Sequence, residues 1–168
     1  MIVTDTHVYF YTNVFSNWYS TQDIKSQFTD NITGLTWNNT EEAFMFYKAF
    51  FFCDTETMDK ICFHSNNKYH PLGVKDLGRL VKKYDDKAWG CVRFGYMVYV
   101  NYLKFSQNAD FKKLLLDTGD RILVEASPVD KIWGVGLEEK DDLILNEKNW
   151  KGQNLLGKAL MEVRSKIK

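Results

Sequence analysis

Residues 37–52 read WNNTEEAFMFYKAFFF and combine a helix start with a long apolar run. Thr40 stands where a helix N-cap is expected, and Glu41 and Glu42 follow in the first turn, where the helix dipole favours carboxylates. The residues from Ala43 to Phe52 have the aromatic and aliphatic composition of a largely buried helix. This stretch therefore predicts a core helix with two acidic groups at its N-terminus.

Helical patterns also dominate the rest of the chain. Apolar spacing predicts further helices over residues 58–65, 76–83, 87–105, 108–116 and 154–167. Short β-favouring runs predict strands at residues 8–11, 35–37 and 122–126, and the polar, turn-rich residues 20–34 are predicted to form a loop. Many helices with a few short strands predict an α+β fold, mostly helical, as a single domain over residues 1–168.

The composition is that of a globular domain, with 45% hydrophobic and 26% charged residues among 168. The 22 basic groups balance the 22 acidic groups, which argues against a protein that coats nucleic acid without sequence preference. The charges are nevertheless unevenly distributed, because the charged side chains of residues 1–58 are mainly acidic and those of residues 59–104 are mainly basic. A basic middle suits a small phosphorylated ligand, or alternatively it is a solvated lysine face.

The cysteines and the termini give expectations about the compartment. Cys53, Cys62 and Cys91 have no CxxC spacing, and an odd number cannot all pair, so a reducing cytoplasm is expected. The chain shows no signal peptide pattern and no apolar stretch long enough to span a membrane. Its three histidines lack the spacing of metal ligands, and no metal or other cofactor is expected. The oligomeric state is left open by the sequence.

The predicted core helix places two opposite charges on one face. Lys48 follows Glu41 by seven residues, which returns it to within about 20° of the same direction on a helix. A carboxylate and an ammonium on one buried face suit an ion pair or a catalytic site. The alternative is that Glu41 only stabilises the helix dipole.

Two glycine-containing segments near the C-terminus are candidates for ligand binding. Residues 130–136 read DKIWGVG, in which Trp133 is placed between turns and suits stacking on a base, whereas the alternative is a core tryptophan with a turn aspartate. They do not form a GxGxxG fingerprint. Residues 150–157 read WKGQNLLG, where Asn154 is expected to cap the last helix. A helix N-terminus can receive an anion, but this segment also fits an ordinary loop-to-helix connection.

Taken in chain order, these segments resemble the NADAR superfamily, the YbiA-like N-glycosidases. The matching residues are 15–19, 37–41, 43–44, 48–49, 52–54, 78–79, 89, 93, 97, 104–105, 114–115, 118–120, 124–126, 130–136, 150–157 and 164. Each motif is weak alone, whereas the ordered set is specific and covers nearly the whole chain. One residue departs from the pattern, because the family usually has histidine after the glutamate and this chain has Glu42. If that histidine contacts substrate in relatives, the specificity here differs.

The resemblance implies a set of site residues. The family's catalytic glutamate falls on Glu41, and Asp130 is implied as the second catalytic residue, which orients ribose or water. The implied substrate-binding residues are Asn17, Lys48, Arg79, Trp89, Trp133 and Asn154. Lys48 and Arg79 would contact phosphate or ribose, since arginine suits bidentate contacts to oxygen.

The resemblance also implies a reaction. Members of the family hydrolyse the N-glycosidic bond of early riboflavin-pathway intermediates and release ribose 5-phosphate. Cleavage of such a bond passes through an oxocarbenium-like state, which a nearby carboxylate stabilises while it activates water. One alternative is removal of ADP-ribose from guanine in DNA, in which case nucleic acid is a partner only as an ADP-ribosylated substrate. Another is a non-catalytic module that binds NAD or ADP-ribose.

Overall fold

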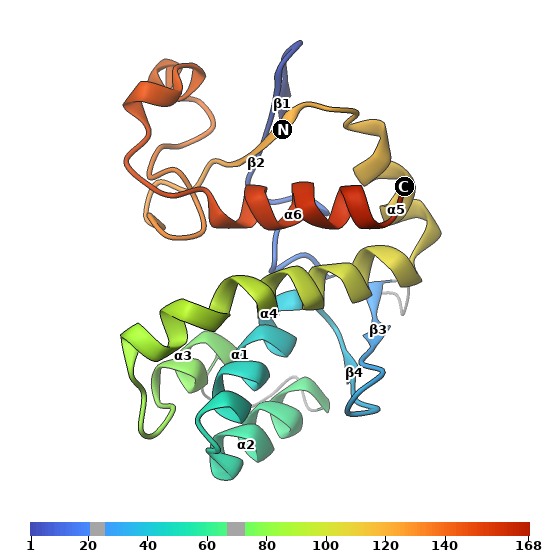
Figure 1. Cartoon of the computed structure of the whole chain (residues 1–168), viewed down its shortest axis with the longest axis vertical. Coiled ribbons are helices and arrows are strands. Elements are labelled where there is room, and N and C mark those ends of the chain that lie inside the picture. The colour runs from blue at the N-terminus through green and yellow to red at the C-terminus, as the bar shows by residue number, and fades with distance from the viewer. Residues whose placement is uncertain (21–25, 67–72) are drawn as a thin grey trace. The chain divides into compact units, whose positions relative to one another are not determined.

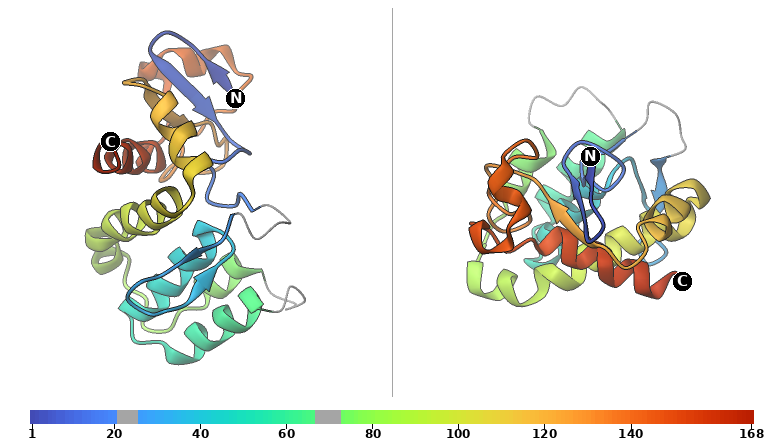
Figure 2. Two further views of the ribbon diagram at one scale, coloured as in Figure 1. Left: turned by 90° about the vertical axis from the view of Figure 1, so that its right-hand side faces the viewer. Right: turned by 90° about the horizontal axis from the view of Figure 1, so that it is seen from above.

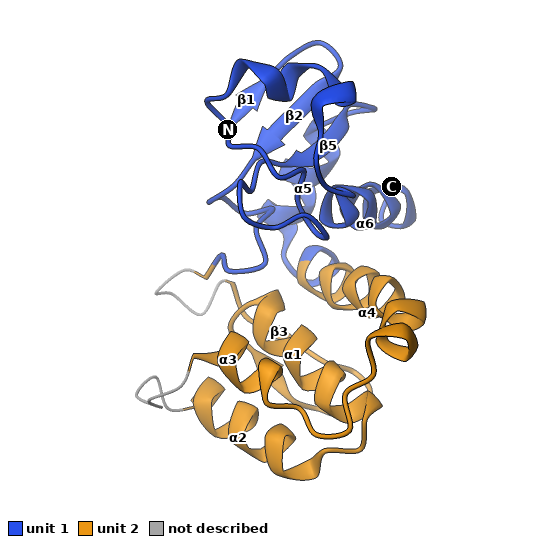
Figure 3. Ribbon diagram, turned by 90° about the vertical axis from the view of Figure 1, so that its left-hand side faces the viewer, with its two compact units in different colours: residues 1–19, 105–168 blue, residues 20–104 orange. Residues whose placement is uncertain are grey.

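The computed structural model describes residues 1–20, 26–66 and 73–168 (Figure 1). The spatial contacts between residues divide the chain into two compact units (Figure 3). Unit 1 consists of residues 1–19 and 105–168, and unit 2 consists of residues 20–104. Unit 1 is therefore assembled from both ends of the chain, with unit 2 inserted between them.

Unit 1 contains a three-stranded sheet with helices packed beside it. The strand order is β1 (Ile2–Val3), β2 (His7–Phe10) and β5 (Ile122–Glu125). β1 runs antiparallel to β2, and β2 runs parallel to β5. Figure 2 shows this sheet from two further sides, with the β1–β2 hairpin in dark blue. The helices are α5 (Ala109–Asp117), α6 (Leu155–Lys166) and two short 3-10 helices, Asp142–Leu145 and Glu147–Asn149.

The core of unit 1 forms where β2, β5 and α6 meet. Tyr9 on β2 and Val124 on β5 are buried in one cluster with Val135 and Ile144 from the segment that follows β5. The apolar face of α6 packs against β5, and its inward positions include the fully buried Leu160. β2 and β5 have only four residues each, and strands this short are not stable alone. The packing of the core and of α6 therefore stabilises the sheet.

Unit 2 is a helical unit with a small two-stranded sheet. Its helices are α1 (Thr40–Phe51), α2 (Thr55–Asn66), α3 (Val74–Arg79) and α4 (Asp86–Gln107), the last three residues of which are assigned to unit 1. β3 (Phe28–Thr29) and β4 (Thr36–Trp37) pair antiparallel. α1 packs against α2 and α3, and its aromatic side chains also contact those of α4. The core helix predicted from the aromatic run is confirmed.

The predicted fold class, α+β and mostly helical with a few short strands, is confirmed. The predicted loop over residues 20–34 is wrong in part, because Phe28–Thr29 forms β3, and residues 21–25 lie outside the described residues. The helix predicted over residues 58–65 begins earlier, at Thr55. The reason is Asp54, whose Oδ1 accepts a hydrogen bond from the Thr57 backbone N–H at 3.2 Å and so caps the first turn.

The helix predicted over residues 76–83 is shorter than expected and ends at Arg79. Beyond it, the Lys82 N–H donates to Asp54 Oδ2 at 2.8 Å, and Lys83 adopts a left-handed backbone with φ of 56°. A long-range hydrogen bond therefore competes with helix continuation, and no local pattern contains that information.

None of the helices in the described ranges combines the length and the hydropathy needed to cross a membrane.

Candidate functional site

The N-terminus of α1 carries the predicted catalytic carboxylate, Glu41. The sequence predicts Thr40 as the N-cap, but the N-cap is Asn39. Asn39 has an extended backbone, and its Oδ1 accepts a hydrogen bond from the Glu42 N–H at 3.0 Å. Thr40 already lies inside the helix. Glu41 is only 7% exposed and lies in the first turn, at the positive end of the helix dipole. The helix start thus holds a nearly buried carboxylate on a backbone that its cap fixes.

Glu42, the residue that departs from the family pattern, has a structural role at the same helix start. Its carboxylate accepts from the Asn38 backbone N–H and the Asn38 side-chain amide, both at 3.1 Å, and from Ser65 Oγ at 2.7 Å. The Asn39 side-chain amide donates to its second oxygen at 3.3 Å. The reciprocal bonds between Asn39 and Glu42 resemble a capping box. Glu42 therefore ties α1 to the loop before it and to the end of α2.

Glu42→Gln is expected to lower the free energy of unfolding by about 1–2 kcal/mol. The reason is that an amide NH₂ group replaces one carboxylate oxygen and then faces the hydrogen-bond donors that this oxygen accepted from. Urea denaturation monitored by circular dichroism measures the change. Glu56→Gln is the matched control, since Glu56 is 55% exposed and its ion pair with Lys60 lies at the surface. Equal stability of the two variants would contradict the capping role of Glu42.

Lys48 lies on the same side of α1 as Glu41, as the seven-residue spacing predicts. Its Nζ donates to the Gly78 carbonyl at 2.8 Å and lies 4.2 Å from the centre of the Tyr84 ring. Burial lowers the pKa of Lys48, while the negative charges of Asp86 and Glu41 act in the opposite direction. The ammonium is thus held by a carbonyl and an aromatic face, within the electrostatic influence of Glu41.

Gly78 brings α3 close to α1 beside this lysine. A Cβ at Gly78 would lie 2.0 Å from the Met45 sulfur, so a larger residue would require the Met45 side chain to move. The next residue, Arg79, is 67% exposed, and its Nη1 pairs with Asp76 Oδ1 at 2.6 Å. A contact between Arg79 and a substrate phosphate stays a prediction.

Trp89 lies in the aromatic core of unit 2. It is 5% exposed and packs against Phe44, Phe51 and Phe52, and it stacks on Tyr96 at 5.7 Å between ring centroids. The structure therefore gives Trp89 a role in packing α1 against α4. A contact between its ring and a substrate stays a prediction.

In unit 1, Asp130 organises the turn that presents Trp133. Asp130 Oδ1 accepts from the backbone N–H groups of Ile132 and Trp133, both at 2.8 Å, while Ser127 Oγ accepts from the Asp130 N–H. Within the described ranges, no hydrogen bond is made by Asp130 Oδ2. The turn aspartate that the sequence left as an alternative is thus present, and a catalytic role of Asp130 stays a prediction.

The two glycine-containing segments lie side by side. The Gln153 N–H donates to the Lys131 carbonyl at 2.9 Å, and the Leu156 N–H donates to the Trp133 carbonyl at 3.1 Å. A Cβ at Gly152 would lie only 2.3 Å from the Gly134 carbonyl oxygen. Glycine is needed here because the two backbones touch, so these two motifs fix the backbone around Trp133.

Asn154 joins this arrangement to the sheet. It occupies the N-cap position of α6 but makes no side-chain cap bond, so the predicted capping mechanism is wrong. Instead, its Oδ1 accepts from the Glu125 N–H at 3.0 Å and its Nδ2 donates to the Leu123 carbonyl at 2.8 Å. Its backbone is left-handed, with φ of 53°. Asn154 is 2% exposed and completes the edge of β5, and substrate binding by it stays a prediction.

Asn17 is buried in the loop that follows β2, with 5% of its surface exposed. Neighbouring side chains fold this loop, since Asn13 Oδ1 accepts from the Phe15 N–H at 3.0 Å and Ser16 Oγ accepts from the Trp18 N–H at 3.3 Å. Local turns thus order the loop around Asn17. A contact between Asn17 and the substrate stays a prediction.

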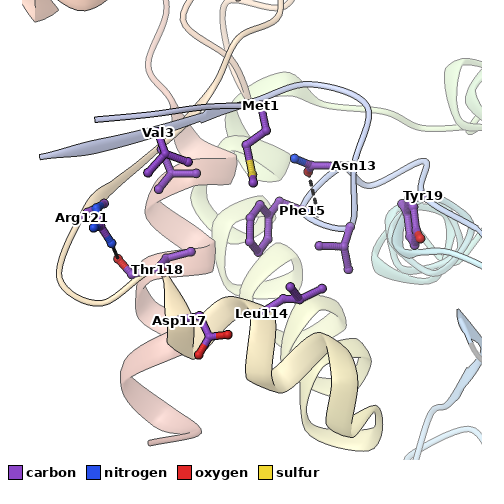
Figure 4. Close-up of a pocket in the computed structure, with 11 residues that line it drawn as sticks. Met1, Val3, Asn13, Phe15, Tyr19, Leu114, Asp117, Thr118 and Arg121 are labelled. Carbon is purple, nitrogen blue, oxygen red and sulfur yellow. Dashed lines mark hydrogen bonds between the residues drawn. The ribbon is translucent and has the colours of Figure 1, made fainter. Parts of the chain in front are cut away.

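Unit 1 also contains a cavity of about 370 Å³ between the β1–β2 hairpin and α5 (Figure 4). Its surface is mainly apolar, with Phe15 and Leu114 among the side chains that line it. At one side, Arg121 Nη1 donates to the Thr118 carbonyl at 3.2 Å. Among the described residues that line the cavity, Asp117 is the one carboxylate, and it is paired with Lys113. This described lining lacks the two carboxylates that glycoside hydrolysis uses.

The predicted site residues belong to both units. Glu41, Lys48, Arg79 and Trp89 are in unit 2, whereas Asn17, Asp130, Trp133 and Asn154 are in unit 1. Sequence reasoning missed Asn38 and Ser65, which fix Glu42, and Tyr84, which fixes Lys48. The spacing of Asn39 and Glu42 is a capping-box signature that was available in the sequence. In the described part of the chain, no three histidine, cysteine or acidic side chains gather as metal ligands.

Comparison with known proteins agrees with the resemblance seen in the sequence. An N-glycosidase of Acanthamoeba polyphaga mimivirus is 36% identical over 172 residues, which cover 96% of each chain. The N-glycosidase YbiA of Escherichia coli is 31% identical over 157 residues, which cover 90% of this chain and 87% of YbiA. The NMR structure of E. coli YbiA superposes with a TM-score of 0.73 at 29% identity, over 99% of this chain and 87% of that one. The sequence model of the NADAR domain matches residues 9–168, which run through both units. The chain therefore belongs to the NADAR domain family.

Proposed function

We propose that this protein is an N-glycosidase that hydrolyses the bond between a base and the ribose of a phosphorylated, nucleotide-like substrate. The observation that carries the proposal is the capped start of α1, where Glu41 is nearly buried and acts electrostatically on Lys48. Two relatives that match along most of the chain are themselves named N-glycosidases, which supports the same reaction class here.

Glu41 is the proposed catalytic carboxylate. As the glycosidic bond breaks, positive charge develops on the ribose ring, and a desolvated carboxylate stabilises that charge and takes a proton from the attacking water. The burial of Glu41 in the first turn of α1 limits the motion of its side chain, which favours a fixed reacting geometry. Lys48, on the same face, supplies a positive charge suited to the phosphate or the ribose hydroxyls.

Asp130 is proposed as the second acidic residue of the reaction. Its Oδ1 is occupied by the turn at Ile132 and Trp133, so Oδ2 is the oxygen proposed to orient ribose or water. Trp133, held by the same turn, is proposed to stack on the base, a contact worth about 1–3 kcal/mol. One turn would thus provide both the polar and the aromatic contact.

We propose a riboflavin-pathway intermediate as the substrate, with free base and ribose 5-phosphate as products. Incubation of the purified protein with such an intermediate, NAD, ADP-ribose and an ADP-ribosylated oligonucleotide, followed by chromatography, tests this choice. Release of ribose 5-phosphate from the riboflavin-pathway intermediate alone is the expected result.

Other results of this assay would indicate a different function. Release of ADP-ribose from the oligonucleotide would identify a glycohydrolase that reverses DNA ADP-ribosylation. Thermal stabilisation by ADP-ribose without any product would contradict an enzyme and identify a binding module.

A further inference from the structure

The cavity of unit 1 between the β1–β2 hairpin and α5, which we name the apolar cavity, has a volume of about 370 Å³ (Figure 4). Val8, Val14 and Phe15 form a buried part of its lining, and each is at most 8% exposed. Val3, the register partner of Val8, and Leu114 on α5 also line it, but they are 53% and 48% exposed. The buried apolar lining thus continues to apolar side chains that water still reaches, and a ligand that covers them gains from the hydrophobic effect.

Two arginine side chains converge at one side of the apolar cavity, at Thr118. Arg121 is partly exposed and lines the cavity. Its Nε donates to the Thr4 carbonyl at 3.0 Å, and its Nη1 donates to the Thr118 carbonyl at 3.2 Å, the bond drawn in Figure 4. Arg164 on α6 reaches the same threonine, and its Nη1 donates to Thr118 Oγ1 at 2.7 Å and to the Arg121 carbonyl at 2.9 Å. Two positive charges are therefore fixed beside an apolar surface.

Two carboxylates that precede Arg121 in the chain are paired with lysines. Asp117, which also lines the cavity, pairs with Lys113 at 2.6 Å. Asp120 is 97% exposed and pairs with Lys168 at 3.4 Å. Within the described ranges, Arg121 donates to carbonyl groups and forms no ion pair. Its positive charge is therefore available to an anion, and a guanidinium has more N–H donors than these two bonds use.

We propose that the apolar cavity binds a small amphipathic anion, a carboxylic acid whose apolar chain fills the cavity and whose carboxylate contacts Arg121. The planar guanidinium suits a carboxylate, because it presents parallel N–H donors to two oxygens. A sugar or a nucleotide is a poor occupant, because its hydroxyl groups would lose water against a mainly apolar surface. The volume lies in the range of small-molecule sites, which favours a free molecule over a segment of a partner protein.

This site is separate from the proposed N-glycosidase reaction. The residues that line the apolar cavity include neither Glu41 nor Asp130, and Trp133 also lies outside the lining. The experiment measures ligand binding and not product formation. Its outcome is therefore independent of the proposed reaction.

Titration of the whole protein with three ligands, measured by isothermal calorimetry, tests both parts of the site. Octanoate has an apolar chain and a carboxylate, octylammonium has the same chain with a positive head group, and acetate has the carboxylate with almost no chain. Octanoate is expected to bind about tenfold more tightly than octylammonium, the effect of charge-assisted hydrogen bonds to Arg121. Acetate is expected to give no saturable binding, because it covers almost none of the apolar surface.

Leu114→Trp is expected to weaken octanoate binding by about tenfold or more, because the larger side chain occupies part of the cavity. Leu143→Trp is the matched control and is expected to leave binding unchanged, since Leu143 is 53% exposed, belongs to unit 1 and is not among the lining residues.

Arg121→Met is expected to weaken octanoate binding about tenfold and to leave octylammonium binding no weaker, because only the anion uses the guanidinium. Circular dichroism checks that each variant is folded. If Arg121→Met does not fold, the two leucine variants and the comparison of the three ligands still decide.

Three results would overturn the proposal. The first is the absence of saturable octanoate binding. The second is equal binding of octanoate and octylammonium, or of octanoate to the parent protein and to folded Arg121→Met, which would mean that Arg121 only binds the carbonyls of Thr4 and Thr118. The third is octanoate binding that is unchanged in Leu114→Trp, or that is lost equally in Leu143→Trp.

Discussion

Glu41→Gln is expected to lower kcat for N-glycoside hydrolysis by about 10²–10⁴-fold, with the thermal unfolding midpoint unchanged. The amide is nearly isosteric with the carboxylate but carries no charge, so it neither stabilises the oxocarbenium-like state nor accepts a proton from water. Folding is expected to survive because the hydrogen bonds that cap α1 are made by Asn39 and Glu42. The product assay on the preferred substrate, together with differential scanning fluorimetry, measures both quantities.

The neighbouring residue supplies the control for this prediction. Glu42→Gln changes the same functional group one position later, in a side chain that is also nearly buried. It is expected to lose stability and to keep most of its activity below its unfolding temperature, which is the reverse of the Glu41→Gln result. If both variants lose activity equally, or if Glu41→Gln keeps the activity of the parent, Glu41 is not the catalytic carboxylate.

Asp30→Ala is expected to lower the free energy of unfolding by about 3–5 kcal/mol, because it removes the acceptor from a buried network of charged hydrogen bonds. Four donors lose their partner at once, among them the Tyr47 hydroxyl, which is buried on α1, and the Tyr99 hydroxyl on α4. Guanidinium denaturation measures the loss. Asp120→Ala is the control, since Asp120 is 97% exposed, and a similar loss in both variants would contradict the network's role.

The same network gives a pH dependence of stability. The pKa of Asp30 is lower in the folded protein than in the unfolded chain, so the stabilisation is complete above the unfolded pKa of about 3.9. It is lost as the pH falls through the lower, folded pKa. The gap in stability between the parent protein and Asp30→Ala is therefore expected to be constant near neutral pH and to narrow in acid below about pH 4. Denaturation curves at neutral pH and in acid compare the two proteins, and a gap that widens in acid would contradict this sign.

The fold class could be predicted because its signals are local. The aromatic run after Glu42 predicts α1, and Asn108 caps α5 by accepting from the Phe111 N–H at 3.0 Å, where the sequence predicts that helix to start. The two-residue strand β3 carries too little pattern to be detected, and it is held by pairing with β4. The end of α3 depends on Asp54, far earlier in the chain.

The same distinction between local signals and long-range contacts applies to the candidate site. The face shared by Glu41 and Lys48 follows from helical spacing alone. The role of Asn154 could not be predicted, because its hydrogen bonds reach back to β5, whereas the local pattern indicates a helix cap. Asp30 stands in a polar, turn-rich segment that gives no sign of burial, and two of its partners are tyrosines on separate helices. Contacts of this kind arise only when the helices pack together.

The assembly of unit 1 from both ends of the chain has a consequence during synthesis. β2 leaves the ribosome before unit 2, whereas its parallel partner β5 and the helix α6 that packs against β5 follow unit 2. The helices of unit 2 lie between them in sequence and have all their own partners much sooner. Pairing between distant segments is slow to form, so we expect a nascent chain in which unit 2 is already ordered while β2 still has an unpaired edge.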